Sequence, residues 1–147
     1  MPLIASLGVM NAVGFGLASS NAIKKQPAIV VGGQYFLVAY PWNTGVGYGT
    51  KYADPSVPPT DYSKEVAFNP SGTVVAATST ADPIINVYAW ISSGFGTKYA
   101  APVGLPAGSG NCVAFNPAGN VIAIAYNDTP RIITYPWSSS GFGTKYA

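Results

Sequence analysis

The heptapeptide VAFNPSG at residues 66–72 decides the fold, because it returns as VAFNPAG at residues 113–119, 47 positions later. Residues 64–100 and 111–147 align around it without a gap and share 21 of 37 residues. Self-similarity at a fixed period of this length is typical of repeat proteins, in which each repeat is one supersecondary unit. The sequence therefore predicts two complete copies of one structural unit.

Two further motifs carry the repeat toward the N-terminus. They are YPW at residues 40–42, which returns as YAW (88–90) and YPW (135–137), and YGTKYA at residues 48–53, which returns as FGTKYA (95–100 and 142–147). Residues 34–55 accordingly read as a partial unit that supplies only the third and fourth strands. We divide the chain into a repeat region at residues 34–147 and a non-repeat segment at residues 1–33.

Each complete unit reads as four short strands. In the unit at 64–100 we predict strands at residues 66–68, 73–80, 84–90 and 97–100. Residues 69–72 form a turn, because Asn bonds its own backbone, Pro fixes φ and Gly tolerates a positive φ. We expect contacts between units to be made by Val66, Phe68, Val74, Ala76, Ile85, Val87, Val113, Phe115, Val121, Ala123 and Ile133.

A four-stranded antiparallel unit of 40–50 residues describes one blade of a β-propeller, so the predicted class is all-β. The Phe-x-Pro-x-Gly hairpin at residues 68–72 and 115–119 resembles the WD40-like propeller family, over about residues 34–147. The chain has no histidine and no Trp-Asp dipeptide, so a Kelch-like or degenerate propeller stays open. Propellers close with four to eight blades, and three copies would supply about seven, so we expect a homotrimer. A longer repeat array is the alternative.

Residues 1–33 do not match the repeat, and we interpret them as an anchoring arm. Its assembly residues would be the apolar Leu7, Val9, Met10, Phe15 and Leu17. The motif AVGFG at residues 12–16 resembles the opening of structural proteins of tailed-phage virions. That resemblance implies docking onto other virion proteins. The alternative is an arm that covers the edge of its own propeller. The apolar run at residues 3–19 is too short to cross a bilayer, so we expect no membrane partner.

The composition argues against catalysis. The chain has no histidine, and its five acidic residues are scattered, whereas acid–base catalysis uses histidine or paired carboxylates. Asp82 and Asp128 occupy equivalent loops with one carboxylate each, which favours solvated side chains over a calcium site. The single cysteine, Cys112, is expected to be buried. We therefore expect no enzyme activity, no cofactor and no metal. Seven scattered basic residues also predict no nucleic-acid partner.

The tryptophans of the repeat have two interpretations. Trp42, Trp90 and Trp137 pack between blades, or they form a platform on which sugars stack. The first interpretation fits the function that we expect: a virion structural or display protein, as a decoration, head-fibre or tail-associated protein. The second fits the alternative, a secreted or surface propeller that binds carbohydrate such as a host-surface glycan.

Overall fold

The computed structural model describes residues 15–18, 28–34, 36–43 and 45–146, and its described part is all-β, with no helix. Twelve strands form three four-stranded antiparallel sheets, and the strands of each sheet follow one another in chain order. The first sheet contains β1 (Phe15–Ala18), β2 (Ala28–Gly33), β3 (Phe36–Asn43) and β4 (Gly47–Tyr48). The second contains β5 (Val66–Phe68), β6 (Val74–Thr78), β7 (Ile85–Ile91) and β8 (Gly94–Lys98). The third contains β9 (Gly110–Phe115), β10 (Val121–Tyr126), β11 (Ile132–Ser138) and β12 (Gly141–Phe142).

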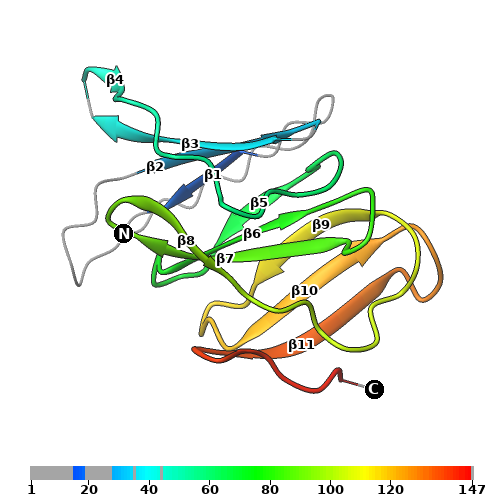
Figure 1. The fold of residues 1–147 in the computed structure, drawn as a ribbon. Helices are drawn as coiled ribbons and strands as arrows, with labels where there is room; N and C mark the ends of the chain where they lie inside the picture. The colour runs from blue at the N-terminus through cyan, green and yellow to red at the C-terminus, as the bar shows by residue number, and fades with distance from the viewer. Residues whose placement is uncertain (1–14, 19–27, 35, 44, 147) are drawn as a thin grey trace.

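The three sheets lie face to face in chain order, from the blue and cyan strands at the top of Figure 1 to the orange and red strands at the bottom. Strand β1 contacts β5, and β5 contacts β9, so the first strands of successive sheets are neighbours. This arrangement is compatible with propeller blades, whose sheets are set around a common channel. Within the described residues the three sheets form an open row and do not close into a ring.

The predicted turn at residues 69–72 is confirmed, and so is its copy in the third sheet. The Asn69 Oδ1 atom accepts hydrogen bonds from the backbone N–H of Thr73 (2.8 Å) and of Val74 (2.9 Å). Gly72 has a φ of 65°, which a glycine adopts without strain. In the third sheet, Asn116 bonds the backbone in the same way. The turn thus holds β5 and β6 together at one end.

The predicted strands of the second unit are found with shifted ends. Strand β5 matches the prediction, β6 lies within the predicted range, and β7 is displaced by one residue. Strand β8 begins at Gly94 rather than at Thr97, because a two-residue turn brings Gly94 directly opposite Ile91. The fourth strand therefore starts with a glycine and an aromatic residue, Phe95.

The first sheet is complete, which corrects the interpretation of residues 34–55 as a partial unit. Strand β1 pairs with β2 from Phe15↔Val31 to Ala18↔Ala28, and β2 pairs with β3. Residues before 34 therefore supply the first two strands of this sheet. Self-comparison missed them because β2 reads AIVVGG and neither strand carries the hairpin heptapeptide. The described residues thus hold three four-stranded sheets, where the repeat alone had indicated two and a part.

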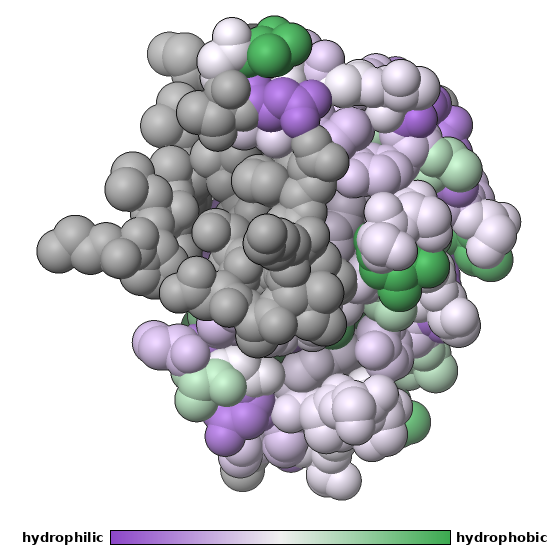
Figure 2. Space-filling model, turned by 90° about the vertical axis from the view of Figure 1, so that its left-hand side faces the viewer, coloured by the Kyte–Doolittle hydropathy of each residue, from purple (hydrophilic) through white to green (hydrophobic). Residues whose placement is uncertain are grey.

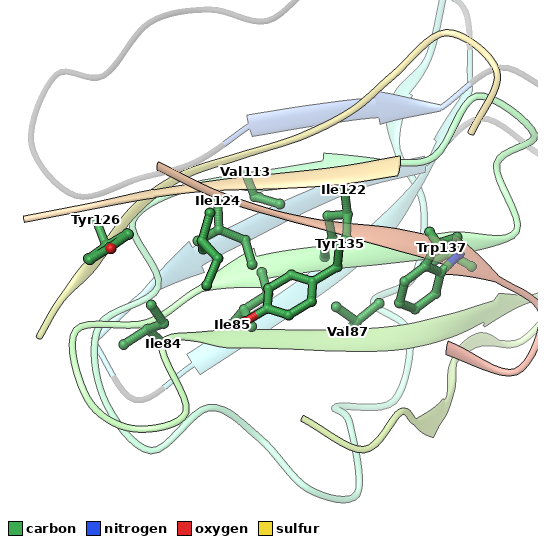
Figure 3. Packing of buried hydrophobic residues seen from close by; sticks show 12 residues of the cluster. Ile84, Ile85, Val87, Val113, Ile122, Ile124, Tyr126, Tyr135 and Trp137 are labelled. Carbon is green, nitrogen blue, oxygen red and sulfur yellow. The ribbon is translucent and has the colours of Figure 1, made fainter. Parts of the chain in front are cut away.

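The two contacts between sheets form the core. Val30, Leu37 and Ala39 of the first sheet pack against a cluster on the second sheet that contains Tyr88 and Trp90. The opposite face of the second sheet packs against the third. Figure 3 shows this contact, where Ile85 and Val87 of β7 lie beside Tyr135, Trp137 and Ile122 of the third sheet.

The predicted contact residues are largely confirmed. Seven are buried: Val66, Val74, Ala76, Ile85, Val87, Val113 and Ile133. Phe68 and Phe115 are partly buried and pack against the two clusters. Val121 and Ala123 correct the prediction, because they are only half-buried while the alternating Ile122 and Ile124 are fully buried. Their side of the third sheet faces away from the second sheet, and no described sheet covers it.

Candidate functional site

An aromatic cluster recurs in each sheet at the third and fourth strands. In the second sheet the rings of Tyr88 and Trp90 lie 5.7 and 5.2 Å from the ring of Phe95. The equivalent pairs are Tyr40–Tyr48 (5.7 Å) and Trp42–Tyr48 (5.6 Å) in the first sheet, and Tyr135–Phe142 (5.5 Å) and Trp137–Phe142 (4.9 Å) in the third. Tilted and edge-to-face ring pairs of this kind contribute about 0.5–1.5 kcal/mol beyond the burial of their surface.

A tyrosine from each linker completes the cluster of the following sheet. Tyr52, after the first sheet, packs edge-to-face on Trp90 at 5.5 Å. Tyr99, after the second sheet, packs on Trp137 at 5.0 Å. Gly94 is part of this contact, because a Cβ atom added there would lie 2.8 Å from the Cβ of Tyr52. The repeated FGTKYA motif is therefore a sheet-to-sheet connector: the glycine just before it, Gly94, receives one tyrosine, and the motif's own tyrosine, Tyr99, reaches the next sheet.

The structure separates the three tryptophans that the sequence treats alike. Trp90 and Trp137 are 3% and 6% exposed and belong to the two core clusters, so neither offers a ring face to a sugar. For these two the stacking interpretation is wrong and the packing interpretation holds. Trp42 is half-buried, and its neighbour Tyr48 is 66% exposed. The open aromatic cluster of the first sheet is thus the candidate binding site among the three.

Most of the predicted assembly arm lies outside the residues that the structure describes. Leu7, Val9 and Met10 fall outside the described residues. Phe15 and Leu17 belong to β1, which pairs with β2 of the same chain. At these two positions the backbone forms the edge strand of the first sheet.

A hollow of about 350 Å³ lies between the second and third sheets. Its walls are Asn69, Ser71, Thr73, Val74, Tyr99, Gly119, Trp137, Ser138 and Ser139. The Nδ2 atom of Asn69 donates to Ser71 Oγ at 2.9 Å and to Thr73 Oγ1 at 3.1 Å, and the two hydroxyl oxygens lie 2.8 Å apart. Much of the polar capacity of this wall is therefore used within the turn itself, which leaves little for a ligand.

Cys112 is exposed, which corrects the expectation that it is buried. It alternates with Val113 on β9, and Val113 takes the buried position against the second sheet. Desolvation, followed by a hydrogen bond to Glu65, raises the pKa of the Cys112 thiol. Reactive cysteines have lowered pKa values, so this thiol has the opposite electrostatic setting.

Two charged residues before β5 tie the second sheet to the third. The carboxylate of Glu65 accepts a hydrogen bond from the backbone N–H of Val113 at 3.1 Å. The ammonium group of Lys64 donates to Ser109 Oγ at 2.9 Å and to Asn111 Oδ1 at 2.7 Å. These contacts satisfy polar groups at the start of β9, so both charges have a structural role.

The described residues contain no group of three or more His, Cys, Asp and Glu side chains close enough to hold a metal ion. Asp82 and Asp128 are both exposed in their loops. No membrane-spanning helix occurs in the part of the chain that the structure describes. Figure 2 shows one side of the molecule, where the described surface is mostly pale and the hydrophobic side chains stand in small separate groups.

No protein-family model matches the chain, and no curated protein matches it. The WD40-like and tailed-phage resemblances therefore rest on their short motifs alone. The blade-like sheets and their aromatic connectors are observed in the chain itself.

Proposed function

We propose that the protein is a non-enzymatic structural protein that displays propeller-type blades on a virion. The observation that carries the proposal is the repetition of one contact: Tyr52 on Trp90 and Tyr99 on Trp137. The aromatic residues that mark the repeat are thus used to join sheets. Stacked units of this kind build extended scaffolds, because each unit contacts only its neighbours.

The virion is proposed from the AVGFG motif at residues 12–16, which resembles the opening of tailed-phage structural proteins. Its last two residues, Phe15 and Gly16, lie in β1 and pair with β2. In this proposal the sheets are displayed outward, and the residues before β1 reach another structural protein of the decoration, head-fibre or tail.

Immunogold electron microscopy tests this function. An antibody raised against the purified chain is applied to virus particles purified from the source of the sequence. We expect gold at a defined position on the capsid or tail. Label confined to the soluble fraction, with bare particles, would refute the virion assignment.

A carbohydrate-binding propeller is the second candidate, and the half-buried Trp42 beside the exposed Tyr48 favours it. Exposed aromatic rings are able to stack on the apolar face of a sugar. A glycan array identifies candidate sugars, and tryptophan fluorescence then follows their titration. Because Trp90 and Trp137 are buried, a fluorescence change that survives in Trp42→Ala would count against this binding site.

A further inference from the structure

The face of the third sheet that points away from the second is built like a covered contact surface. We call it the tail face, and it contains Val121, Ala123 and Ile132. One repeat earlier, Val74, Ala76 and Ile85 occupy the equivalent positions and are 4%, 0% and 1% exposed against the third sheet. Ile132 is 56% exposed. The same residue type at the same blade position is therefore buried in one sheet and open to solvent in the other.

The face of the first sheet that points away from the second is the reciprocal surface, which we call the head face. It carries Tyr40, Trp42 and Tyr48, the equivalents of Tyr88, Trp90 and Phe95. Tyr88 and Trp90 are 1% and 3% exposed, whereas Tyr40 and Trp42 are half-buried and Tyr48 is 66% exposed.

Ile29 on β2 lies opposite Tyr40 and is 3% exposed. The head face is therefore already covered over part of β2. Its open part lies over β3 and β4, where the aromatic cluster is.

Tyr146 is the third linker tyrosine, and its backbone is held as in the first two. In each case the tyrosine N–H donates to the carbonyl oxygen of the third strand of its own sheet. The bonds are Tyr52 to Ala39 (2.9 Å), Tyr99 to Val87 (2.8 Å) and Tyr146 to Thr134 (3.1 Å). The first two tyrosines reach the tryptophan of the next sheet, and Tyr146 is 49% exposed.

The receiving position on the head face is open. Gly47, Gly94 and Gly141 share a positive φ, of 96°, 103° and 103°. A Cβ atom added at Gly94 would meet Tyr52, and one added at Gly141 would meet Tyr99. At Gly47 no described atom lies within 4 Å of such a Cβ. Gly47 thus has the backbone conformation that receives a tyrosine at Gly94 and Gly141, and no described tyrosine occupies it.

We propose that Tyr146 of one copy packs on Trp42 and Gly47 of a second copy, so that the tail face of each covers the head face of the other. The inference rests on the proposed structural function, and the partner that it names is a second copy of the same chain. Head-to-tail contacts make rings when the rotation closes, and propellers close with four to eight blades. Two copies of three sheets give six, whereas three copies would give nine. For residues 1–147 we therefore propose a two-copy ring in place of the trimer.

Native mass spectrometry and sedimentation of residues 1–147 test the stoichiometry, and we expect a dimer. Trp42→Ala and Tyr146→Ala should each raise the dimer dissociation constant at least about tenfold. The dimer contains two copies of the Tyr146–Trp42 contact, and either substitution removes both. Tyr146→Phe should retain most of the affinity. Val103→Ser is the matched control, since Val103 is 93% exposed in the linker between β8 and β9. Circular dichroism verifies that each variant is folded.

The double variant distinguishes this contact from a general loss of stability. Combining Trp42→Ala with Tyr146→Ala should weaken the dimer little more than either change alone, because both remove the same ring pair. Any of three results would overturn the inference: a folded monomer at high concentration, an open-ended ladder of oligomers, or a dimer indifferent to both residues. A monomeric protein together with gold-labelled virions would refute the two-copy ring but would leave the proposed structural function standing.

Discussion

Ile85 and Ile132 occupy the same position of the repeat, and replacing each with alanine measures how much a covering sheet contributes to stability. Ile85 is 1% exposed, so the change removes three buried carbons at about 0.8 kcal/mol each. A cavity term adds to this loss, which brings the expected destabilisation to about 3–4 kcal/mol. Ile132 is 56% exposed, so it loses less than half of the transfer term and leaves no closed cavity. We expect about 1 kcal/mol.

Both substitutions are made in a Tyr146→Ala background, which removes the proposed contact between copies. Urea unfolding, monitored by tryptophan fluorescence, then gives the free energy of unfolding. Trp90 and Trp137 report on it because they lie in the two core clusters. Equal losses for the two variants would refute the reasoning, because they would mean that the tail face is covered within the single chain. An unchanged m-value is needed for the comparison.

Three further predictions use matched positions. Asn69→Ala should lower the free energy of unfolding by about 2 kcal/mol, because the buried N–H of Val74 loses its acceptor. Asn116→Ala should lower it by about half as much, because its turn is more exposed, and the urea midpoints of the two variants measure the difference. Gly94→Ala should lower the free energy of unfolding by about 1 kcal/mol more than Gly47→Ala does. Both positions have a positive φ that strains an alanine, but only at Gly94 would the added Cβ meet a tyrosine. Equal losses would contradict the role of Gly94 as the contact site for Tyr52. Burial raises the pKa of Tyr88, so the unfolded chain ionises first and stability falls as pH rises above 10.0. Tyr88→Phe should flatten this fall between pH 9 and 11.5, by up to about 1.4 kcal/mol per pH unit, in urea titrations at each pH.

Much of the second and third sheets could be predicted, because their signals are local. The turn at residues 69–72 depends on an asparagine and a glycine at fixed offsets. Asn69 accepts the expected backbone hydrogen bond, and Gly72 has the expected positive φ. Alternation then assigned Val66, Ile85 and Val87 to buried positions. Strands β1 and β2 escaped because an apolar run such as AIVVGG has no period that distinguishes it from other buried segments.

The candidate site depended on a different kind of information. The motifs located Trp42, Trp90 and Trp137 without indicating which would be covered, because coverage is set by the neighbouring sheet and not by the local sequence. Cys112 shows the same limit on a smaller scale, since its exposure follows from the register of β9 against the second sheet. The contact of Tyr52 with Trp90 spans 38 positions of the chain and needed the three-dimensional structure.

Because Tyr52 and Tyr99 each bond to the sheet before them and pack on the sheet after them, the two sides of a sheet are different and the row has a direction. Two heads, or two tails, do not complement each other. A gene that gained or lost one whole 47-residue unit would therefore keep the same pair of end surfaces, with every internal junction unchanged. The number of sheets is in this sense adjustable by duplication and deletion, without any new contact having to evolve.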